Sequence, residues 1–240
     1  MFYKDKLYQN YRSTHNAILQ GPQSLDKIKS NFPVYNYFYG AYLPNHKTAK
    51  ILDIGCGDGN FVYFLQQSGY EKACGIDLSE EQILLGRSMG INGIEVADLF
   101  NYLGSKKNEF DLIIAKDVIE HLTKQEAFDA LNMVSAALNE TGQFLMQVPN
   151  GQGLFYTSIF YGDYTHEVAY TEQSVRQLFL NTGFKQSSCY PVNPYKGSIK
   201  GKIRNILWSL KVAQLKFWRM VESGKRTGIF TSNLIAIGKK

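Results

Sequence analysis

The chain has 240 residues, of which 44% are hydrophobic and 20% are charged, so its composition excludes a collagen, a coiled coil and a disordered chain. The net charge of +5 is unevenly distributed: residues 186–240 hold eleven Lys or Arg and one acid, whereas residues 1–185 hold fifteen bases and twenty acids. This asymmetry favours a local anionic partner over a protein that coats nucleic acid. Three cysteines without a CxxC pair, and the lack of an apolar targeting segment, predict a cytoplasmic protein with reduced thiols.

The length favours one domain with an elaboration. Residues 1–45, which become rich in aromatic side chains from Phe32, are predicted to form an N-terminal helical lid segment before a main domain at 46–240. In the main domain, helices are predicted to start at Ser79, Thr123 and Thr171 and to alternate with seven strands, at 51–54, 73–76, 94–96, 110–115, 142–148, 184–192 and 229–237. This alternation predicts an α/β fold, a doubly wound and mostly parallel sheet with helices on both faces. Ligands of such sheets lie outside the carboxyl ends of the strands.

A glycine-rich loop, Asp53-Ile54-Gly55-Cys56-Gly57-Asp58-Gly59, joins the first predicted strand to a helix. Glycines allow a tight turn and a close approach of a ligand to the backbone, beside the free N–H groups of a helix start. Asp77 ends the second strand at the spacing expected of an acid that binds ribose hydroxyls, and Asp98 follows the third strand. Together these features predict a nucleoside site.

The loop and the two acids resemble the motifs of class I S-adenosylmethionine-dependent methyltransferases. The resemblance implies a seven-stranded Rossmann-like sheet whose last strand is antiparallel, with S-adenosylmethionine as the cofactor. In that family the glycine loop packs on the methionine part of the cofactor, the acid matching Asp77 binds the ribose, and the acid matching Asp98 lies at the adenine. The cofactor-binding residues carried over are Asp53, Gly55, Gly57, Gly59, Asp77, Leu78, Asp98, Leu99 and Lys116.

A Lys-Asp-Val-Ile-Glu-His segment follows the fourth predicted strand and resembles the motif of ubiquinone-pathway and small-RNA 2′-O-methyltransferases. In a helical turn Asp117, Glu120 and His121 would share one face, and His166 is a candidate fourth ligand for a divalent metal. The metal-using pattern usually begins with Glu, and here the shorter Asp117 stands in its place. The alternative is that Asp117 caps the helix and His121 has a structural role. We keep a divalent metal as an alternative but do not expect one.

An aromatic loop after the fifth strand ends in Asp163-Tyr164-Thr165-His166 and resembles methyltransferases of bacterial polysaccharide and O-antigen gene clusters. Its aromatic side chains suit sugar rings or bases, although most of them are also explained by packing. His166 is the first candidate for the general base that a hydroxyl acceptor requires, with His121 second and Asp163 as the residue that orients either histidine. A buried structural role for His166 is the competing interpretation.

A basic insert is predicted at about 193–227, with a helix whose apolar face includes Ile203, Leu210 and Val221. Basic residues lie off this face, although Trp208, Val212 and Leu215 interrupt the polar side. Residues 203–221 therefore suit an anionic glycan, a diphosphate or peripheral contact with an acidic membrane. The alternative is a helix packed on the domain with its basic face in solvent.

The main hypothesis is methylation of a sugar hydroxyl in a glycan, glycolipid or nucleotide-sugar pathway, on a small-molecule or glycan acceptor that can be anionic. The alternatives are a quinone-pathway or other small-molecule O-methyltransferase, an RNA 2′-O-methyltransferase, and a protein that binds S-adenosylmethionine without turning it over. No stable nucleic acid partner is expected, because no RNA-binding module is visible and residues 1–185 are net acidic.

Overall fold

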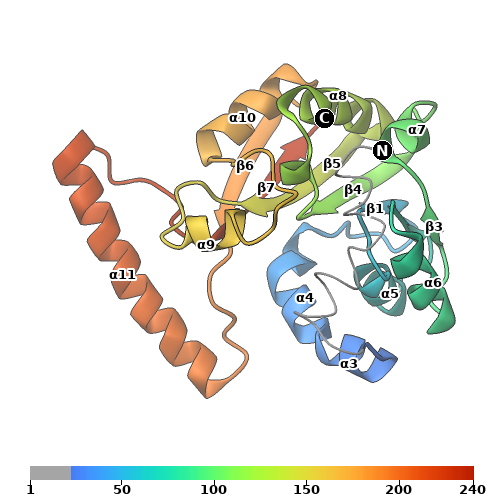
Figure 1. Ribbon diagram of the computed structural model, residues 1–240, viewed down its shortest axis with the longest axis horizontal. Helices are drawn as coiled ribbons and strands as arrows, with labels where there is room; N and C mark the ends of the chain where they lie inside the picture. Colours follow the sequence, from blue (N-terminus) through green and yellow to red (C-terminus); the bar gives the residue numbers. More distant parts are fainter. Residues whose placement is uncertain (1–22) are drawn as a thin grey trace.

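The computed structural model describes residues 23–240, and its centre is a seven-stranded sheet in the order β3-β2-β1-β4-β5-β7-β6 (Figure 1). The first five strands of the chain are parallel, and β7 pairs antiparallel with both β5 and β6. This confirms the predicted α/β class and the antiparallel last strand. The strands are β1 (Ile51–Ile54), β2 (Ala73–Asp77), β3 (Ile94–Val96), β4 (Phe110–Lys116), β5 (Leu138–Pro149), β6 (Gln186–Pro191) and β7 (Asn233–Lys239).

Helices cover both faces of the sheet because alternate strand residues point to opposite sides. Leu52 and Ile113 face a core shared with helices α7, α8 and α10, whereas Ile51 and Leu112 face a core shared with α4 and α5. The helices are α3 (Leu25–Ser30), α4 (Phe32–Tyr39), α5 (Asn60–Gln67), α6 (Glu80–Ser88), α7 (Leu99–Leu103), α8 (Lys124–Ala137), α9 (Tyr156–Phe160), α10 (Glu172–Asn181) and α11 (Ile199–Ser223), with 3-10 turns η2 (Gly40–Tyr42) and η3 (Ile119–His121).

The predicted helix starts are confirmed by their capping hydrogen bonds. The Ser79 side chain accepts the N–H of Gln82, and Thr123 forms a reciprocal capping box with Glu126. Strand ends were less well predicted: β5 begins at Leu138 instead of Gly142, directly after α8, and β7 begins at Asn233 instead of Ile229. The reason is that strand pairing, not local sequence, sets these limits; Asn233 is the first residue that pairs, opposite Pro149.

The N-terminal segment was predicted as a helical lid over residues 1–45, and its first part lies outside the described residues. Residues 23–45 form α3, α4 and η2, which pack on α5 through ring contacts such as Phe32 with Phe64 and Tyr35 with Phe61. The ring centroids of these pairs lie 5.2 Å apart in each case. This segment therefore shares the core of the main domain on the α5 side.

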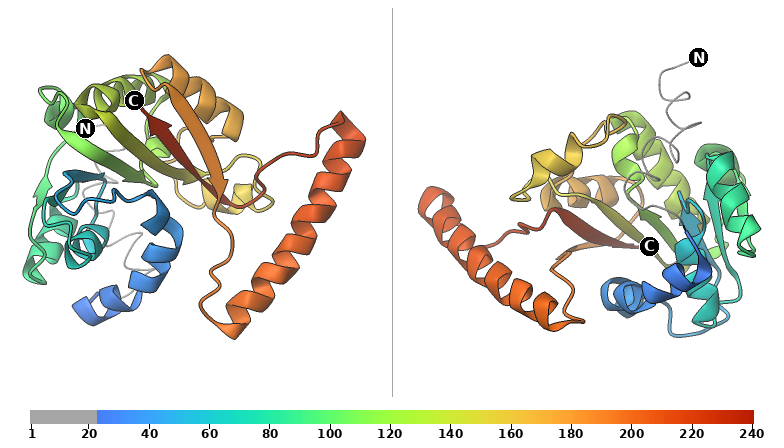
Figure 2. Two further views of the ribbon diagram at one scale, coloured as in Figure 1. Left: turned by 180° about the vertical axis from the view of Figure 1, so that it is seen from behind. Right: turned by 60° about the horizontal axis from the view of Figure 1, so that its bottom comes forward.

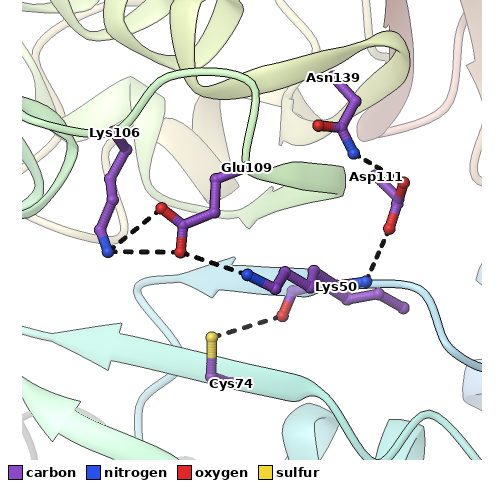
Figure 3. A network of polar contacts seen from close by, with 7 residues as sticks. Lys50, Cys74, Lys106, Glu109, Asp111 and Asn139 are labelled. Carbon is purple, nitrogen blue, oxygen red and sulfur yellow. Dashed lines mark hydrogen bonds and ion pairs between the residues drawn. The ribbon is translucent and has the colours of Figure 1, made fainter.

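A polar network joins the amino-terminal edge of three strands (Figure 3). The Lys50 N–H and the Asn139 side-chain amide both donate to the Asp111 carboxylate at 2.8 Å, and Glu109 lies between the ammonium groups of Lys50 and Lys106. The network fixes the starts of β1 and β4 beside β5. It lies at the edge opposite the glycine loop, so it belongs to the scaffold and leaves the carboxyl ends of the strands available for ligands.

Helix α11 was predicted within the insert at 193–227 and is found there, standing away from the sheet (Figures 1 and 2). The main apolar face of the helix is not packed on the domain: Ile203, Leu210 and Val221 are 52%, 65% and 59% exposed. Among the described residues no helix is both long enough and apolar enough to cross a membrane.

Candidate functional site

The glycine loop after β1 turns back on itself through left-handed backbone conformations. Gly55 has φ +68° and Gly57 has φ +57°, values that a side chain would strain. A Cβ at Gly55 would collide with Val118, and one at Gly57 would lie 3.0 Å from the Gln82 side chain. Glycine is therefore required here both for the turn and for the free space above it.

Asp77 holds this loop from the end of β2. Its carboxylate accepts the backbone N–H of Gly57 and of Ser79, each at 2.8 Å. Burial raises the pKa of Asp77, and these two N–H groups act in the opposite direction by favouring the ionised form. A carboxylate with two oxygens retains acceptor capacity for further donors, so Asp77 can both fix the loop and bind ligand hydroxyls.

A cavity of about 350 Å³ opens above the loop at the carboxyl ends of β1, β2 and β4. Its volume is in the range of small-molecule sites, about 300–1,000 Å³. Six of the nine predicted cofactor-binding residues line it: Gly55, Gly57, Asp77, Leu78, Leu99 and Lys116. The other three, Asp53, Gly59 and Asp98, do not line it, and they support the elements beneath or beside it.

Those three residues have clear local roles. Gly59, at φ +80°, begins α5 where a Cβ would meet Ile91 and Ile94 at 3.0–3.1 Å. Asp98 caps α7 by accepting the N–H of Phe100 and of Asn101 at 3.1 and 3.0 Å. Both residues shape the cavity from behind its wall.

Asp53 is the third, and it lies buried under the loop. It is 1% exposed, and neither carboxylate oxygen has a hydrogen-bond partner among residues 23–240. Burial raises the pKa of Asp53 to about 6, an effect that the nearby Lys116 ammonium reduces and Asp77 increases. The Lys116 Nζ itself lies 3.9 Å from the centroid of the Phe61 ring, inside the cavity wall.

Asp117 begins the segment after β4, and it is not part of the helical turn in which the sequence placed it. Its φ is +56°, a left-handed conformation outside any helix, and the helical turn is the short η3 at Ile119–His121. The Gln147 side chain donates to both Asp117 oxygens at 3.2 and 3.0 Å and accepts the Tyr39 hydroxyl at 2.7 Å. Asp117 therefore lines the cavity as part of a chain that reaches helix α4.

The aromatic loop brings Asp163 and Thr165 to His121. The Thr165 hydroxyl donates to Asp163 Oδ1 at 2.6 Å and lies 2.8 Å from His121 Nδ1. Since that hydroxyl proton is committed to the carboxylate, Thr165 Oγ1 accepts the proton of His121 Nδ1. This assignment makes His121 Nε2 the acceptor nitrogen. His121 and Asp163 are each 9% exposed, and His121 is the histidine that lines the cavity.

His166 lies beside His121, with ring centroids 4.7 Å apart, and its Nδ1 donates to the carbonyl of Phe160 at 2.8 Å. The structure thus brings together all three predicted catalytic residues. Asp163 is connected to His121 by hydrogen bonds through Thr165, and His166 contacts His121 through its ring. His166 is outside the cavity lining.

Glu120, His121 and His166 offer ligand atoms that all lie within 4.8 Å of one another. Asp117, the first residue of the predicted metal set, is not among them. Glu120 is 0% exposed, and its two oxygens have no hydrogen-bond partner among the described residues. Burial, followed by the charge of Asp117, raises the pKa of Glu120 well above its ordinary value, which favours a neutral carboxyl group.

Sequence reasoning missed Thr165, Gln147 and Tyr39. Thr165 stands within the Asp-x-Thr-His segment, so its spacing from Asp163 was a usable signal for a local side-chain hydrogen bond. Gln147 meets the Asp117 region because β4 and β5 pair with Lys116 opposite Gln147. That register depends on the whole sheet, and no local motif indicates it.

The strand order, the antiparallel β7 and an acid-braced glycine loop at the end of β1 define the class I S-adenosylmethionine-dependent methyltransferase fold. Residues 33–188 match the family described as methyltransferase domain. Because the match covers more than half of the chain, the chain belongs to that family.

The residues of the cavity fit the cofactor of this class, S-adenosylmethionine. Glycines leave the floor open where a Cβ would fill it, and Asp77 faces the cavity with a carboxylate suited to ribose hydroxyls. Leu78 and Leu99 add apolar surface on the same side, as a nucleobase requires.

A solved structure shows the same fold, and curated relatives match part of the sequence. A S-adenosylmethionine-dependent methyltransferase from Archaeoglobus fulgidus aligns with a TM-score of 0.65 at 20% identity, over 90% of this chain and 97% of that one. An uncharacterised protein of Rickettsia prowazekii is 30% identical over 114 residues, which are 43% of this chain and 44% of that protein. The yeast (Saccharomyces cerevisiae) 18S rRNA (guanine(1575)-N(7))-methyltransferase is 31% identical over 107 residues, 40% and 39% respectively. The chain thus spans less than half the length of these curated relatives.

Proposed function

We propose that the protein transfers a methyl group from S-adenosylmethionine to a hydroxyl of a sugar in a glycan, glycolipid or nucleotide sugar. When bound, S-adenosylmethionine supplies a methyl group on a positively charged sulfur, which an acceptor oxygen takes in a single displacement. The observation that carries the proposal is the Asp163–Thr165–His121 chain of hydrogen bonds, which ends at the cavity wall.

A hydroxyl is a weak nucleophile until its proton is being removed, and His121 is arranged to remove it. With the ring proton on Nδ1 donated to Thr165, Nε2 is the nitrogen that receives the acceptor proton. The resulting imidazolium is stabilised by the Asp163 carboxylate through the Thr165 hydroxyl. An amine or a ring nitrogen with a lone pair does not need this arrangement, so the arrangement favours a hydroxyl acceptor.

Exposed aromatic side chains on the loop that carries Asp163 and Thr165 support a sugar as the acceptor. Phe155, Tyr161 and Tyr164 are 60%, 77% and 84% exposed, on the same loop as Asp163 and Thr165. Residues this apolar are seldom left in solvent at such density without a ligand to cover them. The C–H faces of a sugar ring match aromatic faces, while the hydroxyls at its edge reach polar groups. The name of the yeast relative specifies guanine as its acceptor. The match covers only 40% of this chain, so we infer the acceptor from the residues of this chain's own site.

The proposal is tested with methyl-labelled S-adenosylmethionine and separate acceptor fractions: sugar nucleotides, glycolipids with polysaccharide, total RNA, and quinone-type lipids. We expect label in a sugar-containing fraction. Label confined to RNA or to quinone-type lipids would contradict the sugar assignment and favour one of those acceptors. Cofactor binding by calorimetry with no transfer to any fraction would favour a non-catalytic binding protein.

A matched pair of variants tests the base. His121→Gln should lower the transfer rate by about 10²–10⁴-fold, the usual contribution of a general base, with little change in cofactor affinity. His46→Gln, on an exposed turn outside the cavity, should leave the rate unchanged. If His166→Gln abolishes transfer while His121→Gln retains it, the base is His166.

A further inference from the structure

Helix α11 is attached at both ends to the sheet edge where the cavity opens. It lies between the end of β6 and the start of β7, and Pro191 and Pro149 pair with neighbouring residues of β7, Leu234 and Asn233. Between these points the helix runs for 25 residues, about 38 Å at 1.5 Å per residue. Gly201 is the only buried residue in the helix. The ribbon views show it standing apart from the sheet and its covering helices (Figures 1 and 2).

The helix has two apolar stripes on opposite sides, a smaller one that is half-buried and a larger one that is exposed. Trp208, Val212 and Leu215 are half-buried and lie on one side at about 100° per residue. The larger stripe is exposed, and each of its members has more than half of its surface in solvent. We call it the outer face; its members and exposed fractions are Ile199 78%, Ile203 52%, Ile206 62%, Leu207 61%, Leu210 65%, Phe217 53%, Trp218 58% and Val221 59%.

Basic side chains border the outer face. Lys200, Arg204 and Lys211 follow one edge, at about 60–100° from its centre, and Lys202 follows the other. From Lys196 to Arg226 the chain carries nine Lys or Arg and a single acid, Glu222. Long basic side chains at the border of an apolar stripe place their charges in water or at phosphates while the stripe is buried.

We propose that the outer face of α11 lies in the surface of an anionic lipid bilayer, parallel to the membrane plane. An amphipathic helix that carries Lys and Arg at its borders, and Trp, Phe and Leu on one face only, has the pattern of an interfacial helix. The helix is too polar to cross a membrane. The inference concerns where the protein acts and does not depend on the acceptor proposed above.

A second copy of the chain is a poorer occupant of the outer face. Two outer faces packed together would place two rows of Lys and Arg beside each other, with Glu222 as the only acid in each helix. An anionic bilayer instead supplies the opposite charge along the whole length, at about 1 kcal/mol for each basic residue near the surface, or about fivefold in affinity.

Vesicle co-flotation tests the proposal with the whole protein. We expect binding to phosphatidylcholine vesicles that contain phosphatidylglycerol, weak binding to pure phosphatidylcholine, and weakening by salt. The variant Leu207→Gln/Leu210→Gln/Phe217→Gln should bind at least about tenfold more weakly, since three exposed apolar side chains are removed. The control Leu84→Gln/Leu180→Gln removes two exposed leucines of other helices and should bind like the wild type.

Charge-reversal variants measure the electrostatic contribution to vesicle binding separately from the apolar contribution. Arg204→Glu/Lys211→Glu, at two of the border positions, should reduce binding at least about tenfold, whereas Lys72→Glu/Lys124→Glu, at exposed positions outside α11, should not. Unchanged cofactor affinity in all variants shows that they fold. Failure of the wild type to bind anionic vesicles, or equal binding by the outer-face variant, would overturn the proposal, as would concentration-dependent dimers that the outer-face variant abolishes.

The two tryptophans of the chain report the orientation of the helix directly. Trp218 lies on the outer face and Trp208 on the inner stripe, so Trp208→Phe and Trp218→Phe each leave one reporter. On addition of anionic vesicles we expect a blue shift and quenching by brominated lipid for Trp218, with little change for Trp208. Quenching of Trp208 alone would contradict the proposed orientation.

Discussion

Asp77 combines a structural role with a predicted role in binding the cofactor. It is predicted to bind ribose hydroxyls, and it also accepts two loop N–H groups at 2.8 Å. Asp77→Ala should therefore weaken S-adenosylmethionine binding at least about tenfold and lower the free energy of unfolding by about 1–3 kcal/mol, because two N–H groups lose their acceptor. Calorimetry and urea unfolding measure the two effects. Loss of stability with unchanged affinity would show that Asp77 only braces the loop.

Thr165 is a positioning residue, since it acts through His121. Thr165→Val keeps the shape and removes the link to Asp163, so we expect the rate of methyl transfer to fall about 10–100-fold without a change in cofactor affinity. The chain has four histidines, which makes nitrogen-15 NMR of the imidazoles practicable. The wild type should show His121 protonated at Nδ1, and Thr165→Val should disturb that tautomer.

The comparison variant is Thr48→Val, at an exposed threonine that lies 3.4 Å from Nδ1 of His46, outside the cavity. It should leave both the rate and the His121 signals unchanged. An unaltered His121 tautomer in Thr165→Val would refute the hydrogen-bond chain as the source of positioning.

The buried Asp53 makes stability depend on pH. Its pKa is about 6 in the folded protein against 3.8 ordinarily, so the folded state favours the protonated form. This raised pKa makes the wild type lose about 3 kcal/mol of stability as the pH rises from below 3.8 to above 6. Asp53→Asn should escape this loss, and urea unfolding at about pH 4.5 and pH 7.5 measures it.

The gain from Asp53→Asn should be largest at the higher pH and nearly absent at the lower one. S-adenosylmethionine would bring positive charge to the cavity above this carboxylate, so the variant should also bind the cofactor more weakly. Equal free energies of unfolding for the wild type and Asp53→Asn at both pH values would show that burial of the ionised Asp53 does not destabilise the protein.

Among the elements, α4 is linked to the site by the chain Tyr39–Gln147–Asp117. Burial raises the pKa of Tyr39 far above its usual range, so its hydroxyl stays a donor. Tyr39→Phe should cost about 1–2 kcal/mol of stability and raise the Kd for cofactor a few-fold, because Gln147 loses one partner and Asp117 loses its support. Tyr37→Phe, on the same helix but 41% exposed, is the matched control. Identical effects of both variants would argue against the link.

Elements with strong local signals were predictable from the sequence. Ser79, Thr123 and Thr171 each begin a helix through a side-chain cap, and the glycine loop indicated its own turn. Asp117 was misplaced because its left-handed backbone follows from pairing with β5, where its N–H donates to the carbonyl of Gln147 at 2.9 Å. The outward direction of the α11 apolar face was also unpredictable, because periodicity gives a face but not its partner.

For the whole molecule, polar groups are divided between the two edges of the sheet. The amino-terminal edge has the structural network of Asp111 and Glu109, and the carboxyl-terminal edge has Asp53, Asp77, Asp117 and the histidine pair. The basic α11 leaves from the same carboxyl-terminal edge. A net acidic body with a basic, outward-facing helix fits an enzyme whose acceptor is found at an anionic surface, as a glycolipid or membrane-bound glycan would be.

The most direct test of the central claim is the chemical identity of the bond that the enzyme makes. Labelled product should be hydrolysed and its monosaccharides analysed by mass spectrometry. We predict a methyl ether on a sugar hydroxyl, which survives mild base and disappears from reactions with His121→Gln. Label on nitrogen, or in a base-labile ester, would contradict the account, because neither product requires the base that Asp163, Thr165 and His121 are arranged to provide.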